Sequence, residues 1–158
     1  MNPPDTAAYH LVHANVAHAR APLDSPVMAG FVAQVEEINA LARRAAGFVA
    51  QPAVPDEGAV FAAPFLLNVS LWESVAHLDA FTHQGRHARA LEQRAEWFEQ
   101  AGAGPKYVLY WIRKGHCVTE RQVKGRLEYL GGHGATPYAF TFERPFTAAQ
   151  AAEFDPAG

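Results

Sequence analysis

Five segments of the chain have the length and the β-branched or aromatic content of strands: residues 9–17, 48–50, 65–72, 107–112 and 138–142. The most apolar is 65–72, and its near-continuous hydrophobicity predicts a central strand that is covered on both faces. The segment 138–142 alternates between small or polar and aromatic residues, so it predicts a last strand.

The first strand candidate has an unusual polar face. Because side chains alternate along a strand, His13 and Asn15 fall on the same face as Leu11. Two hydrogen-bonding side chains on one face of a strand indicate that this face lines a wet cavity.

Apolar residues at helical spacing predict helices over residues 26–42, 74–82, 86–101 and 119–131, and a short one in the tail after 145. Ser25, followed by Pro26, is the expected N-cap of the first of these helices. Thr119, with Gln122 three residues later, predicts a capped start for the fourth.

The resulting order, β-α-β-β-α-β with an extra C-terminal helix and strand, predicts an α+β fold of the ferredoxin-like kind. Such a fold is an antiparallel sheet with helices on one face, and its other face needs a cover. Two subunits that pack their open faces together would form a dimeric α/β barrel, so we expect a homodimer. We find no linker, and we expect a single domain over residues 1–158 with a core at about 9–146.

Composition limits the classes of partner. Charged residues make up 18% of the chain, below the roughly 25% of typical soluble domains, which favours extra surface covered by a second subunit. A net charge of −3 without clustered Lys and Arg argues against nucleic-acid binding. No apolar run approaches the roughly 20 residues of a membrane span, and no signal peptide is visible. With one cysteine, Cys117, the expected location is the cytoplasm.

Eight histidines are the main chemical anomaly of the sequence. His83 and His87 have the spacing of a zinc-protease motif, but Gln84 replaces the glutamate that would act as the base. This replacement argues against a metalloprotease, and the pattern favours two surface or helix-end histidines over a zinc site. Cys117 follows His116 directly, with no third group to orient the pair, which favours an incidental thiol over a nucleophile.

A resemblance to a known family is carried by a set of short motifs, at residues 15, 20–26, 47–49, 68–74, 96–98, 115–116 and 134–142. Together they resemble the uncharacterised bacterial family called domain of unknown function 3291, over about residues 9–146. The resemblance implies membership of the dimeric α/β barrels, whose relatives include antibiotic-biosynthesis, haem-degrading and spheroidene monooxygenases. One fold can carry many chemistries, so the reaction does not follow from the resemblance.

The haem-degrading relatives suggest roles for particular residues. They use an asparagine on the first strand, which Asn15 matches, and an axial histidine, for which His87 is the candidate and His83 the rival. Phe81 stands where those relatives have a tryptophan, so the resemblance implies haem binding more than haem degradation. No other cofactor is implied.

Two hypotheses therefore remain open. The first is a monooxygenase-like oxidoreductase that acts on a hydrophobic small molecule and binds haem. In it, Asn15 would bind dioxygen or a substrate carbonyl, His87 would ligate iron or move protons, and His116 would be a second polar group at the pocket edge. The alternative is a small-molecule-binding or accessory barrel without catalysis, in which the histidines are structural.

Overall fold

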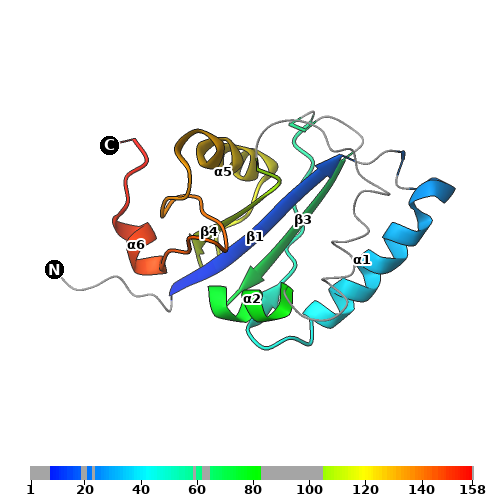
Figure 1. Ribbon diagram of the computed structural model, residues 1–158, viewed down its shortest axis with the longest axis horizontal. Helices are drawn as coiled ribbons and strands as arrows, with labels where there is room; N and C mark the ends of the chain where they lie inside the picture. The colour runs from blue at the N-terminus through cyan, green and yellow to red at the C-terminus, as the bar shows by residue number, and fades with distance from the viewer. Residues whose placement is uncertain are drawn as a thin grey trace.

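The computed structural model describes residues 8–18, 21–22, 24–58, 60–61, 65–82 and 105–157 (Figure 1). The described strands are β1 (Tyr9–His18), β2 (Phe48–Ala50), β3 (Phe65–Trp72) and β4 (Tyr107–Arg113). The described helices are a 3₁₀ turn (Pro26–Met28), α1 (Ala29–Ala42), α2 (Val75–Thr82), α5 (Glu120–His133) and α6 (Ala148–Glu153). The predicted helix over 86–101 lies outside the described residues.

The strands form one antiparallel sheet in the order β2-β3-β1-β4. β1 lies between β3 and β4, with Ala14 opposite Val69 on one side and opposite Val108 on the other. This order, with α1 between β1 and β2 and α2 after β3, is the ferredoxin-like arrangement, so the predicted α+β class is confirmed.

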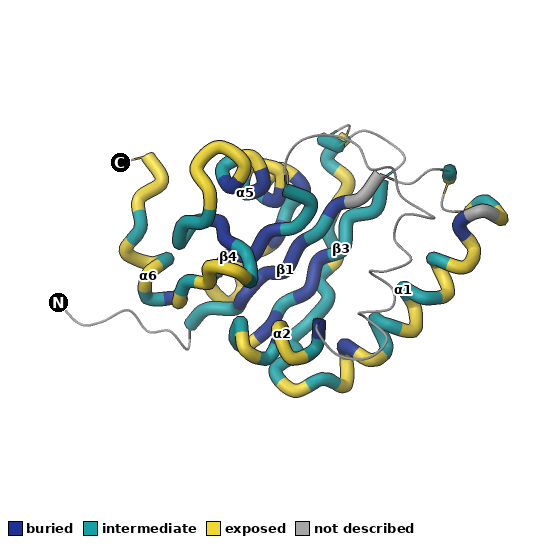
Figure 2. Tube along the Cα trace, in the orientation of Figure 1, coloured by how far each residue is buried: buried dark blue, intermediate teal, exposed yellow. Residues whose placement is uncertain are grey.

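Alternation along β1 divides the core into two layers. Val12, Ala14 and Val16 point to one face and meet a cluster that includes Val123, Leu127 and Leu130 of α5. These apolar contacts exclude water from this face of β1 and β4. Figure 2 shows the buried residues following the strands, whereas much of α1 is exposed.

The opposite face of the sheet packs against α2 and the C-terminal segment. Leu11 and Trp72 lie here with Leu78 of α2 and with Phe140, and all four are almost completely buried. Phe48 and Phe81 extend this cluster by edge-to-face and tilted ring contacts with Trp72 at centroid distances of 5.4 and 5.3 Å.

Both faces are therefore covered by this chain itself over much of the described sheet. The predicted homodimer depended on an open face, but α5, Val54 and Phe61 pack on that face. The expected homodimer and its barrel therefore stay predictions. The large hydrophobic side chains that are exposed among the described residues, Val32 and Leu41, lie on α1 instead.

The predicted last strand at 138–142 does not form. Only Phe140 bridges to β4, where it exchanges two backbone hydrogen bonds of 2.9 Å with Leu109. Tight turns at 136–139 and 141–144 flank this bridge and take up the neighbouring backbone groups, so no ladder can extend from it.

The two predicted caps behave differently. The Thr119 hydroxyl accepts a hydrogen bond from the backbone N–H of Gln122, as expected. Ser25 occupies the N-cap position before the 3₁₀ turn but makes no capping bond, because its hydroxyl donates backwards to the carbonyl of Pro22. The helix after Thr119 also runs past the predicted end at 131 and stops at Gly134, whose φ is +74°.

This difference gives a paired prediction for stability. Thr119→Ala removes an acceptor for a helix N–H and is expected to lower the free energy of unfolding by about 1 kcal/mol. Ser25→Ala removes an exposed contact and is expected to change it by less than about 0.5 kcal/mol. Urea denaturation of the two variants and the parent measures both, and equal losses would contradict the assignment of the caps.

Candidate functional site

A row of polar side chains crosses β1 and β3 on the face that carries α2. Asn15 lies opposite Asn68, and His13 lies opposite Ser70. The Ser70 hydroxyl accepts a hydrogen bond of 2.8 Å from the indole N–H of Trp72, so this hydroxyl is engaged in the core. The polar face predicted for the first strand is therefore continued on the neighbouring strand.

His13 is enclosed by aromatic rings. It is 8% exposed, and its ring lies 6.0 Å from that of Tyr107 and 6.1 Å from that of Phe142. The Tyr107 hydroxyl accepts a hydrogen bond of 3.2 Å from the backbone N–H of Phe142, which fixes one wall of this enclosure. The imidazole is thus part of the packing between the sheet and the C-terminal segment.

A cavity of about 500 Å³ lies beside β3. Its lining combines apolar side chains with amides and carboxylates: Asn39, Gln51, Pro52, Val54, Asp56, Phe65, Leu67, Asn68, Val69 and Glu120. The cavity exists because β2 is short. β2 pairs with β3 only at Leu71 and Trp72, so the first half of β3 has an open edge that faces the loop after β2.

The cavity wraps around this edge of the sheet. Leu67 and Val69 point to the face covered by α5, whereas Asn68, between them in sequence, points to the other face, towards Asn15. The cavity therefore has an apolar side on one face of β3 and an amide side on the other.

The wall opposite β3 is held in place by a reciprocal pair of hydrogen bonds between residues far apart in sequence. The backbone N–H of Glu57 donates to Oε1 of Glu120 (2.7 Å), and the backbone N–H of Arg121 donates to Oε1 of Glu57 (2.9 Å). The Nε of Arg121 also lies 3.8 Å from Oε2 of Glu57. We call this pair of bonds the 57–120 clasp; it ties the loop after β2 to the first turn of α5.

Glu120 is 5% exposed, which is rare for a carboxylate. Two features make its burial tolerable, namely the Glu57 N–H and its position in the first turn of α5, where the helix dipole favours negative charge. Asp56 lies at the exposed rim, where its Oδ1 accepts from the Gly58 N–H at 2.8 Å.

The structure separates the residues that the sequence suggested as a site. Asn15 is half-buried beside Asn68, whereas His116 is exposed in the turn after β4, at the opposite end of β1. Phe81 stacks on Trp72 in the core. His83 and His87 lie outside the described residues.

The described lining of the cavity offers no usual ligand for haem iron. The side chains that line the cavity in the described part of the chain offer amide oxygens, carboxylates and carbon surface, with no imidazole or thiolate for haem iron. No group of three or more His, Cys, Asp or Glu residues that could hold a metal ion occurs among the described residues. Haem binding through His87, with His83 as the rival, stays a prediction.

Sequence reasoning missed Glu120 and the cavity. Glu120 follows the N-cap Thr119, a place where a solvated carboxylate is ordinary, so the local pattern gave no reason to single it out. Its contact with Glu57 spans 63 residues and is visible only once the fold is known.

The fold and cavity define an α+β protein with a ferredoxin-like sheet and an amphipathic pocket at its edge. The profile of a family described as "Domain of unknown function (DUF3291)" matches residues 10–155, so the chain belongs to this family, as the sequence motifs predicted. No curated protein matches the chain.

Two solved structures resemble parts of the chain. The crystal structure of PA3566 from Pseudomonas aeruginosa is 12% identical with a TM-score of 0.49, over 70% of this chain and 98% of that one. NE2512, a protein of unknown function from Nitrosomonas europaea, is 12% identical with a TM-score of 0.46, over 71% of this chain and 95% of its own. Neither likeness bears on function. Within the described residues, no helix is long and apolar enough to cross a membrane.

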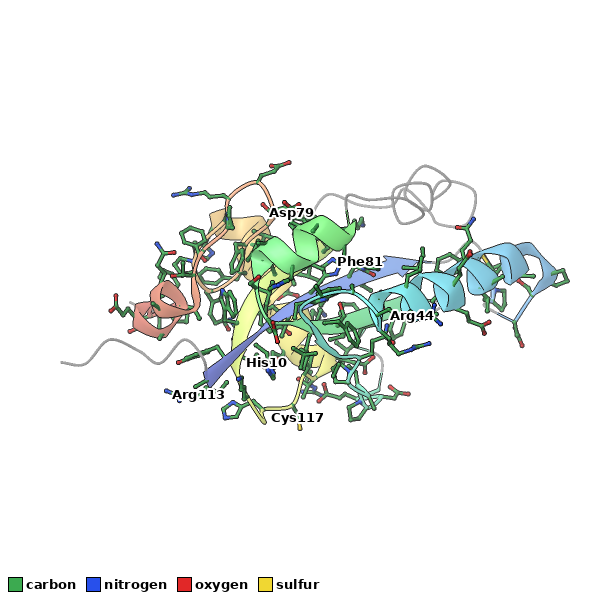
Figure 3. The ribbon with its side chains drawn as sticks, turned by 90° about the horizontal axis from the view of Figure 1, so that it is seen from below. His10, Arg44, Asp79, Phe81, Arg113 and Cys117 are labelled. Atoms are coloured by element: carbon green, nitrogen blue, oxygen red, sulfur yellow. The ribbon has the colours of Figure 1, made fainter. Side chains whose placement is uncertain are left out.

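A histidine with a shifted pKa lies away from the cavity. Burial lowers the pKa of His10 below its ordinary 6.5, the nearby Lys114 lowers it further, and Glu73 opposes both effects. Figure 3 shows His10 on the opposite side of the sheet from Phe81. The cause of the shift is burial beside a cation, and His10 does not line the cavity beside β3, which favours a structural histidine.

This shift predicts a pH dependence of stability. The folded state disfavours protonated His10, so the unfolded state binds more protons below pH 6.5 and stability falls as the pH is lowered through the folded pKa. His10→Gln removes the titrating group and is expected to flatten the fall in unfolding free energy between about pH 7 and 5. Denaturant titrations across this range check it, and an unchanged slope would assign the pH dependence to other groups.

Proposed function

We propose that this protein binds a small molecule with an apolar body and hydrogen-bonding groups in the cavity beside β3. The observation that supports this most directly is the cavity itself. At about 500 Å³, it falls within the roughly 300–1,000 Å³ of small-molecule sites. Its mixture of carbon surface and a few convergent polar groups is also typical of such sites.

The lining suggests how such a ligand would lie. Phe65 and Leu67 provide carbon surface for a ring or chain. Asn39 and Asn68 provide amide groups that can both donate and accept, so they would orient a polar end of the ligand. A ligand that spans the edge of β3 would use both sides at once.

A monooxygenase-like reaction on this ligand is the second function that we propose. It is favoured by the position of Asn15, whose register partner Asn68 lines the cavity. The resemblance to cofactor-independent and haem-dependent monooxygenases gives Asn15 the role of a hydrogen-bond donor to dioxygen or to a substrate carbonyl. Reactions of this class without a cofactor rely on an electron-rich substrate, which the protein has only to bind and orient.

Filling the cavity tests the binding proposal. Val54→Trp introduces a bulky ring from the loop wall, where the native side chain is half-buried and lines the cavity. Tryptophol, a neutral indole alcohol, is the probe. We expect its affinity to fall by about tenfold or more in the variant, as expected when pocket volume is taken up.

The measurement is the titration of backbone amide NMR signals. In the parent, the shifted signals are expected to include Gln51, Leu67 and Asn68, which line the cavity. Val32→Trp, an equal change at an exposed site on α1, serves as the control and should bind tryptophol like the parent. Shifts that map to another surface, or that persist in Val54→Trp, would contradict the proposal.

Haem binding is tested separately, because its predicted ligands are not part of the described cavity. If His87 ligates haem iron, His87→Ala abolishes the shift of the haem Soret band and His83→Ala leaves it nearly intact. Haem titration of the parent and both variants measures this. Equal, tight binding by the parent and His87→Ala would remove His87 as the ligand, and no saturable shift in the parent would remove haem itself.

A further inference from the structure

The charge of the cavity lining is one-sided. Two carboxylates, Asp56 and Glu120, line it, and none of the described lining residues is Lys, Arg or His. We infer that the ligand is a cation, namely an amine with an apolar ring or chain. This inference rests on the binding function proposed above and names the chemical class that the same cavity takes.

Glu120 is the anchor for the ammonium group. Its carboxylate is buried, and the Glu57 N–H engages only Oε1. A carboxylate has about four lone-pair sites, so the clasp leaves acceptor capacity on Glu120 for an ammonium group. Low exposure strengthens this attraction, because nearby solvent screens it less than at the surface.

The other polar groups suit the remaining N–H donors. An ammonium group carries three donors and no acceptor. Two further amides line the same cavity: Asn39 can supply an acceptor, and Oε1 of Gln51, which accepts from Arg43, keeps a second lone pair. Asp56 at the rim adds a second negative charge, which favours the entry of cations.

An anionic ligand meets the opposite conditions. Its carboxylate would lie among Asp56 and Glu120, and like charges at short distance are unfavourable. The exposed Arg43 does contact one lining residue, donating to Oε1 of Gln51 at 3.3 Å, but it does not line the cavity itself. This hydrogen bond also orients the Gln51 amide.

A purely structural role for Glu120 is the competing explanation, because the clasp alone accounts for its burial. Glu120→Gln separates the two roles. Glutamine keeps an oxygen that can accept from the Glu57 N–H, so it retains the clasp bond, but it removes the charge. A structural role then predicts no change in the preference among ligands, whereas an anchoring role predicts its loss.

The experiment compares three indole probes that differ in their end group: tryptamine (a cation), tryptophol (neutral) and indole-propionate (an anion). Amide NMR titrations of the parent are expected to give cavity-localised binding, with tryptamine about tenfold tighter than tryptophol and indole-propionate the weakest. Glu120→Gln should bring tryptamine to about the affinity of tryptophol in the same variant.

Two further variants test the second carboxylate of the cavity and a control carboxylate outside it. Asp56→Asn changes an exposed rim residue that cannot compromise the core, and it should weaken tryptamine alone, by a smaller factor than Glu120→Gln. Glu128→Gln removes an equal charge from α5 at an exposed site paired with Lys124, so it should bind all three probes like the parent.

Different results would contradict the binding function and the amine as its ligand. Cavity-localised binding in which tryptophol or indole-propionate matches tryptamine would overturn the amine and leave the binding function standing. A tryptamine preference that survives both Glu120→Gln and Asp56→Asn would also overturn it. If none of the three probes shifts the amides of the cavity, the binding function itself fails and the amine with it.

Discussion

The pairing of β1 on both of its edges is the constraint on which the rest of the structure depends. Its backbone is hydrogen-bonded to β3 and β4 along nearly its whole length, so its alternate side chains must enter two different cores. Val12 and Ala14 are buried on the α5 face, and Leu11 is buried on the α2 face. A slip of one residue in this register would exchange the two sets and place His13 and Asn15 under α5.

The cavity follows from a mismatch in length between the outer strands. β4 accompanies β1 for seven residues, but β2 has three, so one edge of β3 is left for a loop to cover. A loop covers an edge less completely than a strand, and the 57–120 clasp ties this loop to the first turn of α5. Glu120, which forms this clasp, is also one of the two carboxylates that line the cavity.

Most of the fold could be predicted from the sequence because its signals are local: the apolar run 65–72, the spacing in 26–42 and the Thr119 cap each depend on neighbours in the chain. The prediction of a strand at 138–142 was wrong because turns on both sides compete for its backbone groups.

The cavity site could not be predicted from the sequence, because it depends on contacts between residues far apart in the chain. Its main parts, Glu120, Asn68 and the loop after β2, come together only through strand register and a contact across 63 residues. The number of histidines suggested a histidine site, yet His13 is packed among rings and His116 is exposed at the opposite end of β1 from Asn15.

The charge of the cavity constrains what an oxygenase reaction on its ligand could be. Carboxylates near a substrate disfavour a second negative charge, so forming an enolate or phenolate close to Glu120 would be costly. The electron-rich part of a substrate would therefore lie at the other end of the cavity, where Asn68 adjoins Asn15. An amine anchored at Glu120 and an electron-rich ring on the amide side of β3 satisfy both conditions, because the edge of the sheet separates the two ends of the cavity. Under this proposal, Asn15 and Asn68 on one face of the sheet and Glu120 on the other would contact the two ends of one ligand.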